Sequence, residues 1–226
     1  MNTRDKIKKV MAALIETYGR PVKFEKDDPV DVLIRTVLSQ NTTDKNSLKA
    51  FAQLKAEFKS WDEVLSSPLR KISGAIKHAG LANIKAGRIK DILAEIKKRE
   101  DRITLSFLNI FTVKDGLEYL QSLKGVGPKT AACVLLFSFD KSVMPVDTHI
   151  FRVTKRLGLI GGKTDIKEAH KILTEIVPKH LIYEFHLGII EHGRRTCKAQ
   201  TPHCGVCCVY GLCDFKKNAS VGDLGT

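Results

Sequence analysis

The chain has 226 residues, of which 43% are hydrophobic and 28% are charged, a balance that is ordinary for a soluble globular protein with a buried core. Its longest apolar stretch, around residues 131–139, is well short of the roughly 20 residues that span a membrane, which excludes a transmembrane helix. The formal net charge of +13 favours a polyanionic partner, because neutralised phosphates release counterions.

The start of the chain has no apolar core followed by a small-residue cleavage site, so no export signal is evident. We therefore expect a cytoplasmic protein, associated with the nucleoid if its source is prokaryotic. The apolar residues of this segment recur at the spacing of a helix that belongs to the folded domain: Ile7, Val10, Met11, Leu14 and Ile15. Without export, the six cysteines are expected to be metal ligands or thiols rather than disulfides.

Helical periodicity dominates the chain, and no segment alternates with the period of two that is typical of strands. The sequence therefore predicts an all-α fold of short helices. After the first helix, helices are expected over residues 30–39, 61–65, 69–77, 84–99, 113–123, 147–157, 165–177 and 181–192, and after Pro128. Asp44 is expected to cap a further helix, with core-facing side chains at Leu48, Phe51, Ala52 and Phe58. A polar loop is expected at residues 40–43 and a turn at 80–83.

Residues 123–153 hold the densest group of chemical signals. The run Gly125-Val126-Gly127-Pro128 predicts a tight hairpin, because glycine permits turns and close backbone approach to a ligand. Pro128 suits the first turn of a helix, and the free amides at such a helix start, where Lys129 and Thr130 follow, can bind a phosphate. With an amine at Lys129 and a carboxylate at Asp147, the stretch indicates chemistry on a phosphodiester-linked substrate.

Lys129 and Asp147 each have two interpretations. Taken alone, Lys129 is expected to contact a backbone phosphate; as a nucleophile it attacks only in its neutral form, which desolvation or a helix start favours. Asp147 is either the N-cap of the helix after Pro145 or a carboxylate that faces positive charge developing on a sugar. A carboxylate favours the charged form of a nearby amine, so Asp147 is expected to move protons or stabilise that positive charge rather than activate Lys129. One role does not exclude the other.

Four cysteines near the C-terminus form a C-x6-C-x2-C-x5-C pattern: Cys197, Cys204, Cys207 and Cys213. This density of thiols predicts a metal centre, either zinc on four thiolates or an iron–sulfur cluster. Cys208 is adjacent to Cys207 and therefore poorly placed to converge on the same metal, and Cys133 is expected to be a buried packing residue. Arg194 and Lys198 lie close to the first cysteine and are either solvated charges or phosphate contacts.

Together these segments resemble the helix-hairpin-helix DNA glycosylase superfamily, and within it the endonuclease III branch. The resemblance is carried by LKGVGPKTA at residues 123–131, VDTHIFRV at 146–153 and the cysteine pattern, with further similarity in VLSQNTTD at 37–44 and GLANIKA at 80–86. It extends over nearly the whole chain. The cysteine spacing combined with Lys129 and Asp147 is specific, whereas the hairpin alone indicates only DNA binding.

The resemblance implies two all-α domains that flank a DNA-binding cleft. One is a six-helix domain at residues 24–140 that contains the helix-hairpin-helix. The other combines residues 1–23 and 141–226 and ends in a loop in which the four cysteines bind a [4Fe–4S] cluster, rather than zinc, with a structural or DNA-positioning role. The implied partner is double-stranded DNA that contains damaged bases or abasic sites, and the implied oligomeric state is a monomer.

The activity that the resemblance implies is that of a bifunctional DNA glycosylase and abasic-site lyase of base excision repair, with oxidised pyrimidines as expected substrates. The damaged nucleotide is flipped into a pocket, and Lys129 attacks its anomeric carbon and expels the base. The resulting Schiff base allows β-elimination on the 3′ side. Asp147 is the essential carboxylate, and the amides of Gly125 and Gly127 hold a backbone phosphate.

Two positions depart from the family pattern. The family commonly has Gln at the position of Asn41, where it fills the space left by the flipped base; here the shorter Asn41 follows Gln40, so the plug is expected to be built differently. Leu81 matches the apolar wedge of the family, but Ala82 stands where Tyr is common. Both departures bear on the substrate range and leave the expected chemistry of Lys129 and Asp147 intact.

Three alternatives remain open from the sequence. A glycosylase of the same superfamily could excise a mismatched or alkylated base, although relatives without lyase activity typically lack a lysine at the position of Lys129. A non-catalytic iron–sulfur or zinc protein would bind duplex DNA with steep salt dependence and cleave nothing. An iron–sulfur redox protein would explain neither the hairpin nor the basic charge.

Overall fold

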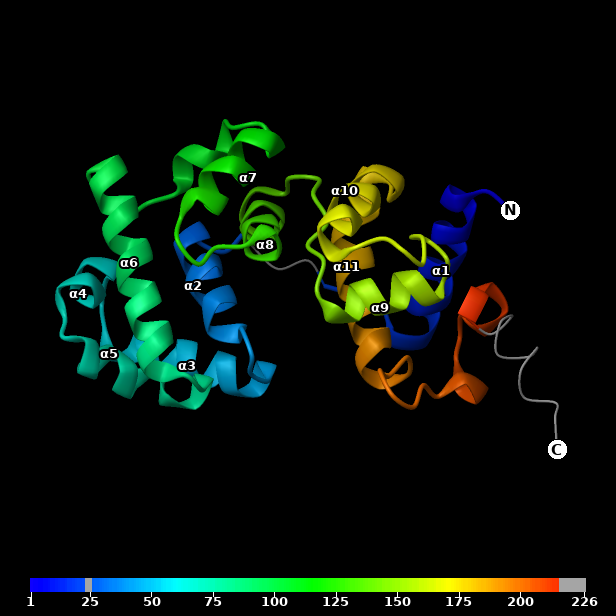
Figure 1. Ribbon diagram of the computed structural model, residues 1–226, viewed down its shortest axis with the longest axis horizontal. Coiled ribbons are helices and arrows are strands. Elements are labelled where there is room, and N and C mark those ends of the chain that lie inside the picture. The colour runs from blue at the N-terminus through cyan, green and yellow to red at the C-terminus, as the bar shows by residue number, and fades with distance from the viewer. Residues whose placement is uncertain (23–25, 216–226) are drawn as a thin grey trace. The chain divides into compact units, whose positions relative to one another are not determined.

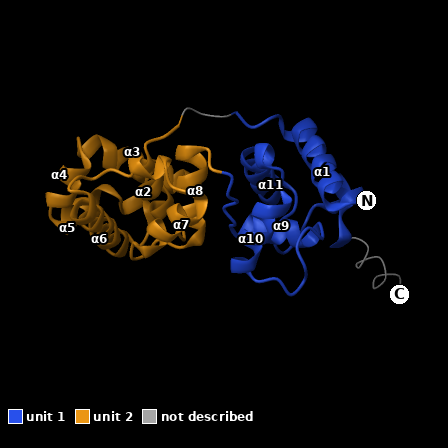
Figure 2. Cartoon of the chain, turned by 90° about the horizontal axis from the view of Figure 1, so that it is seen from above, with its two compact units in different colours: residues 1–24, 142–226 blue, residues 25–141 orange. Residues whose placement is uncertain are grey.

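The computed structural model describes residues 1–22 and 26–215. Every regular element in these ranges is a helix, which confirms the all-α fold (Figure 1). The chain divides into two compact units, residues 25–141 and residues 1–24 together with 142–226 (Figure 2). None of the helices in the described ranges is long and apolar enough to cross a membrane.

The unit formed by residues 25–141 is built around two buried helices, α2 and α8. Its α-helices are α2 (Pro29–Ser39), α3 (Asp44–Glu57), α4 (Trp61–Ser66), α5 (Leu69–Ala75), α6 (Ala82–Glu100), α7 (Val113–Ser122) and α8 (Pro128–Phe139), and its 3-10 helices are η1 (Lys77–Ala79) and η2 (Ser106–Asn109). Helix α2 packs against α8, α3 and α6, and α7 packs against α8. Almost all of α8 from Thr130 to Leu136 is buried, so the helix that follows the hairpin is anchored in the core.

The described part of this unit has seven α-helices rather than the six that the resemblance implied. Residues 61–75 form two short helices, α4 and α5, as the sequence predicts. Pro68 separates them, because it has no N–H to continue a helical ladder. Helix α4 closes with the amide of Ser67 bonded to the carbonyls of Glu63 and Val64, and α5 begins after Pro68.

Helix α3 differs from its expected cap and face. Its N-cap is Thr43, whose hydroxyl accepts from the amide of Asn46, and Asp44 is the first helical residue, where a carboxylate favours the positive helix end. The expected core residues Leu48 and Ala52 are exposed, Phe51 is half-buried, and Phe58 is buried. The side chains of α3 that are buried are Ser47, Ala50 and Leu54. Helix α3 packs against α2, η1 and α5, and Leu48 lies outside this packed face.

The other unit contains α1 (Thr3–Tyr18), α9 (Thr148–Arg156), α10 (Ile166–Ile176), η3 (Lys179–Leu181), α11 (Ile182–Arg195), η4 (Cys204–Val206) and η5 (Tyr210–Leu212). Helix α11 packs against both α9 and α1. The fully buried Phe185 lies in this core, and a Cβ at Gly188 would be 3.5 Å from Leu14 Cδ1, so α1 and α11 are in close contact. The first helix is thus part of the folded unit, as its apolar spacing predicts.

Candidate functional site

The hairpin expected at residues 123–128 connects α7 to α8. The amide of Val126 donates to the carbonyl of Leu123 over 3.0 Å, and Gly125 has a φ of 87°, a left-handed conformation that favours glycine. Gly127 is the N-cap of α8 and provides no side-chain cap, while Pro128 occupies the first helical turn. Because the first amides of a helix lack intrahelical acceptors, the start of α8 offers donors for an anion.

Lys129 follows Pro128 in the first turn of α8 and is half-buried. Its ammonium has no ion-pair partner among the residues that the structure describes. The neighbouring Thr130 and Val126 are buried, with 3% and 5% exposure, so they support the hairpin from beneath. A primary amine therefore stands directly beside the amides that suit a phosphate.

Two further loops of the same unit carry predicted DNA contacts. Asn41, after the end of α2, is exposed and has a φ of 53°; Leu81, before α6, is 55% exposed and has a φ of 50°. Both are non-glycine residues in the left-handed region. The turn expected at residues 80–83 is shorter than predicted, because α6 already begins at Ala82. A single exposed apolar side chain is ordinary at a protein surface, so the contact role of Leu81 stays a prediction.

Arg88 of α6 connects one of these loops to the hairpin. Its Nη1 donates to Gln40 Oε1 over 2.6 Å, and its Nε lies 2.6 Å from the position that a Cβ on Gly125 would occupy. Arg88 therefore holds the Gln40 side chain through this hydrogen bond. The positive φ of residue 125 and the close approach of Arg88 both favour glycine there.

Asp147 belongs to the other unit and caps α9. Its Oδ1 accepts from the amide of Ile150 over 2.8 Å, which confirms the N-cap interpretation. The side chain is half-buried. Lys129 and Asp147 thus come from different units, at residues 25–141 and 142–226.

The four patterned cysteines line a single pocket beside α9 and α11: Cys197, Cys204, Cys207 and Cys213. Cys208 does not line it. Burial raises the pKa of the Cys207 thiol to about 11, and the charges of Cys208, Cys197 and Cys213 act in the same direction. Neighbouring thiolates repel one another, so a bound cationic group would stabilise the ionised form of these cysteines.

The pocket does not present the arrangement of a single-ion site. Within the described residues, no three His, Cys, Asp or Glu side chains are placed so that they could hold a metal ion. Zinc needs its four sulfur atoms within about 2.3 Å of one point, whereas a four-iron cluster binds one thiolate at each of its irons and keeps the sulfurs farther apart. Four thiols that line one pocket fit the donor set of a thiolate-ligated metal group.

Sequence reasoning missed the side chains that hold this cysteine loop. Arg152 Nε donates to the carbonyl of Cys197 over 3.0 Å, and Arg156 Nη1 lies 3.3 Å from the Cys197 sulfur. Nε2 of the buried His192 lies 3.7 Å from the Cys207 sulfur, and its Nδ1 contacts the Tyr18 hydroxyl at 3.0 Å. The i, i+4 spacing of Arg152 and Arg156 on the helix after Asp147 was a signal available in the sequence.

The predicted basic contacts near the cysteines lie at the surface. Arg194 is in the last turn of α11, and Lys198 follows Cys197; both side chains are exposed. The backbone carbonyl of Lys198 accepts from Arg156 over 2.6 Å, which fixes its position on the loop. These positions are compatible with phosphate contacts.

A glycine hairpin, free helix-start amides and a net positive charge, in a chain whose described regular elements are all helices, are typical of a DNA-binding helix-hairpin-helix protein. The sequence profile of the HhH-GPD superfamily of base excision DNA repair proteins matches residues 34–179. This is more than half of the chain, and the chain therefore belongs to that superfamily.

The names of several relatives bear on activity. Endonuclease III of Thermotoga maritima is 33% identical over 204 residues, covering 90% of this chain and 91% of the relative. A protein of Arabidopsis thaliana, provisionally named a DNA glycosylase, is 38% identical over 170 residues; the match covers 75% of this chain and 58% of that protein, less than two thirds of its length. A solved endonuclease III, trapped as a covalent intermediate with DNA, has a TM-score of 0.80 at 28% identity, covering 97% of this chain and 100% of that chain.

Proposed function

We propose that the chain is a DNA glycosylase with abasic-site lyase activity that removes damaged bases, with oxidised pyrimidines as its substrate class. The observation that carries the proposal is the position of Lys129, whose half-buried amine stands at the start of α8 beside the hairpin amides. The amides would hold a backbone phosphate, which brings a deoxyribose within reach of the amine. The covalent endonuclease III–DNA intermediate among the relatives supports the same assignment.

The proposed reaction begins with extrusion of the damaged nucleotide from the duplex. The neutral amine of Lys129 attacks C1′ of the deoxyribose, the bond from C1′ to the base breaks, and the base leaves with its bonding electron pair and takes up a proton. Ring opening converts the covalent adduct to a protonated imine. Loss of a proton from C2′ then expels the 3′ phosphate by β-elimination, and water releases the lysine from the nicked product.

Asp147 is the proposed carboxylate of this reaction. One oxygen caps α9 through the amide of Ile150, which holds the side chain in place. The second oxygen would stabilise positive charge that develops on the sugar, or carry protons between intermediates. The cap and the catalytic role are compatible because they use different oxygens.

The proposed cofactor is a [4Fe–4S] cluster, with Cys197, Cys204, Cys207 and Cys213 as ligands. When bound, the cluster supplies a fold-stabilising cross-link rather than a reactive centre. Arg152 and Arg156 also bind the backbone of the loop, and the loop displays the charge of Lys198. The cysteine loop therefore presents a basic side chain for the proposed phosphate contacts.

The test is borohydride trapping on an abasic-site duplex and on a thymine-glycol duplex. Wild type and Lys124→Ala should form covalent complexes with both duplexes, and Lys129→Ala should form neither while still binding DNA. Lys124 is the matched control because it is an exposed lysine on the same hairpin. Trapping on the abasic duplex alone would keep the lyase and reassign the base specificity. No trapping by the wild type would refute the proposal in favour of a monofunctional glycosylase or a DNA-binding protein.

A further inference from the structure

We propose that Lys85 and Arg88 of α6 are positioning residues that hold the Gln40–Asn41 loop, the Leu81 turn and the hairpin in the arrangement that extrudes a damaged nucleotide. This inference rests on the proposed function and adds residues to it. It concerns residues 25–141 alone, so every contact that supports it lies within one compact unit.

Lys85 is a buried cation without a carboxylate partner among the described residues. Its side chain is 2% exposed, and its Nζ donates to the carbonyls of Leu38 over 2.8 Å and Ala79 over 2.7 Å. Burial lowers the pKa of Lys85, and the charge of Arg88 acts in the same direction. Burying a lysine ammonium costs free energy unless its N–H groups are hydrogen-bonded. The loss of either of these two hydrogen bonds would therefore be unfavourable.

The two carbonyls lie at the ends of two helical segments. Leu38 is in the last turn of α2, two residues before Gln40, and Ala79 ends η1, two residues before Leu81. Terminal carbonyls carry partial negative charge and have no intrahelical donors, so one ammonium can satisfy both. Lys85 therefore joins the two segment ends from which the predicted DNA-contacting loops emerge.

Both loops contain conformations that need such support. Asn41 and Leu81 are non-glycine residues with φ values of 53° and 50°. Left-handed conformations of this kind are sparsely populated and persist where neighbouring contacts fix them. Leu81 is also 55% exposed, so the hydrogen bonds behind the loop, rather than burial of its own side chain, hold it in place.

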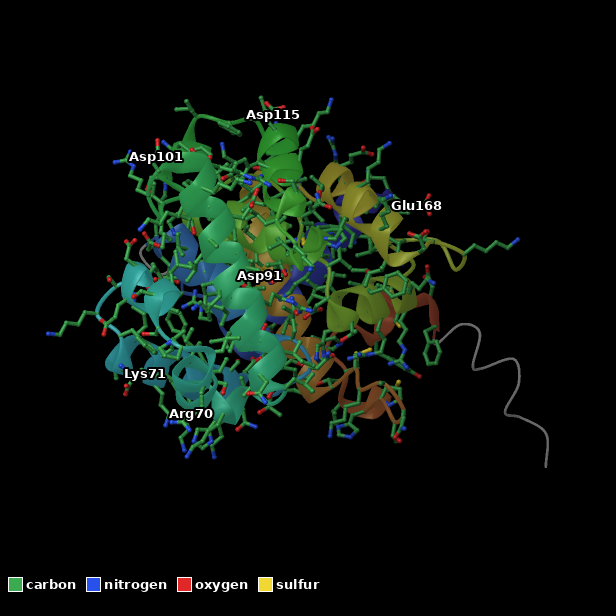
Figure 3. All side chains as sticks on the ribbon, turned by 60° about the vertical axis from the view of Figure 1, so that its left-hand side comes forward. Arg70, Lys71, Asp91, Asp101, Asp115 and Glu168 are labelled. Atoms are coloured by element: carbon green, nitrogen blue, oxygen red, sulfur yellow. The ribbon has the colours of Figure 1, made fainter. Side chains whose placement is uncertain are left out.

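Arg88 extends the support to the hairpin. It lies three residues after Lys85 on α6, donates to Gln40 Oε1 over 2.6 Å, and fills the space beside Gly125. The residues at positions 85 and 88 are neighbours on one side of the helix. Asp91, labelled on α6 in Figure 3, is exposed. Three segments that are far apart in sequence thus share one helix as their common support.

Helix α6 also offers a matched control. Lys90 is half-buried and donates to the carbonyl of Ser67 over 2.7 Å, where it supports the link between α4 and α5. It repeats the lysine-to-carbonyl contact of Lys85 on the same helix, but its carbonyl partner lies outside the three predicted DNA-contacting segments. A general loss of helix packing should therefore appear equally in Lys85→Met and Lys90→Met.

The experiment compares these two variants in the full-length protein. Extrusion is followed by the fluorescence of 2-aminopurine placed next to a thymine glycol, and catalysis by single-turnover base removal and by borohydride trapping on an abasic duplex. Misplacing the loops should slow base removal by Lys85→Met about 10–100-fold and reduce the fluorescence rise, because positioning errors of about 1 Å have effects of this size. Abasic-site trapping should stay within about threefold, because no base remains to be extruded. Lys90→Met should match the wild type in all three.

Equal losses in Lys85→Met and Lys90→Met, or a loss in abasic-site trapping as large as that in base removal, would overturn the inference. If Lys85→Met fails to fold, as judged by its melting curve, Lys85→Gln replaces it, because a shorter side chain that keeps N–H donors still withdraws the ammonium from the carbonyls of Leu38 and Ala79, and it should show the same split. A wild type that neither excises nor traps would refute the proposed function, while the fluorescence comparison would still decide whether Lys85 controls extrusion.

Discussion

Arg156 joins the helix that Asp147 caps to the loop that carries the cysteines. Its Nη1 lies 3.3 Å from the Cys197 sulfur and 2.6 Å from the Lys198 carbonyl, and its Nη2 lies 2.8 Å from the Ala199 carbonyl. The guanidinium of Arg156, together with that of Arg152, therefore couples the position of α9 to the conformation of the loop.

Replacing Arg156 with Met should destabilise this unit by roughly 1–3 kcal/mol, because three hydrogen bonds are lost and two carbonyls lose a donor. Thermal and urea unfolding measure the effect. Lys155→Met is the control, since Lys155 on the same helix lies over the Phe151 ring. Equal melting temperatures for Arg156→Met and the control would show that the loop is held without Arg156.

Two substitutions separate the capping role of Asp147 from its proposed catalytic role. Asn is as good an N-cap as Asp, so Asp147→Asn should change the free energy of unfolding by less than about 0.5 kcal/mol. Because the carboxylate charge is lost, single-turnover base removal should nonetheless fall about 100-fold or more. Asp147→Ala should lose the same activity and, in addition, about 1 kcal/mol of stability. Wild-type rates for Asp147→Asn would reduce Asp147 to a cap.

The cysteine assignment predicts two classes of variant. A single Cys→Ser change at Cys197, Cys204, Cys207 or Cys213 should remove the brown colour of the purified protein and lower its melting temperature. Cys208→Ser should keep both, because Cys208 does not line the pocket. Iron content and visible absorbance provide the measurement. Bleaching of Cys208→Ser, or zinc in place of iron in the wild type, would contradict the ligand assignment.

The two hairpin glycines should respond differently to alanine. Gly125→Ala places a side chain at a φ of 87° and against Arg88, so it should cost about 1–2 kcal/mol of folding stability. A Cβ at Gly127 meets no atom within 4 Å, so Gly127→Ala should preserve stability. Both should weaken binding to duplex DNA, because a methyl group lies where the phosphate approaches. Unfolding curves measure the stability effect, and DNA titrations at fixed salt measure the affinity effect. Unchanged affinity of Gly127→Ala would show that no phosphate binds at this site.

Acid should destabilise the protein in part through His170. Burial lowers the pKa of this imidazole below 6.5, while its Nδ1 hydrogen bond to the Met144 carbonyl, 2.9 Å long, opposes the shift. As pH falls through 6.5, the unfolded chain takes up a proton that the folded chain does not, so the free energy of unfolding decreases.

His170→Asn can retain the donor but cannot titrate in this range, so its stability should fall less than that of the wild type between about pH 7 and about pH 5. Urea unfolding at both pH values gives the comparison. His192, whose burial lowers its pKa to about 4, contributes to both proteins and cancels in the difference. Identical pH dependence in the two proteins would show that His170 does not contribute.

The sequence by itself determined the features that depend on neighbours along the chain. Pro128 after two glycines indicated the hairpin and the start of α8, and Asp147 indicated the cap of α9, because turns and caps are made by backbone groups only a few residues apart. The recurrence of apolar residues at helical spacing likewise predicted an all-helical fold. The spacing of the cysteines indicated that four of them, without Cys208, share one site.

Only the tertiary structure decided which faces are buried and which polar groups meet. Leu48 is exposed while Ser47 is buried, because α2 and not the hydrophobicity of α3 alone determines the contact. The burial of Lys85 could not be read from its neighbours either, since lysine is usually solvated and its two acceptors lie 47 and 6 residues away. Burial depends on the surface that another segment provides, and the partners of a buried charge are known only once those segments have packed.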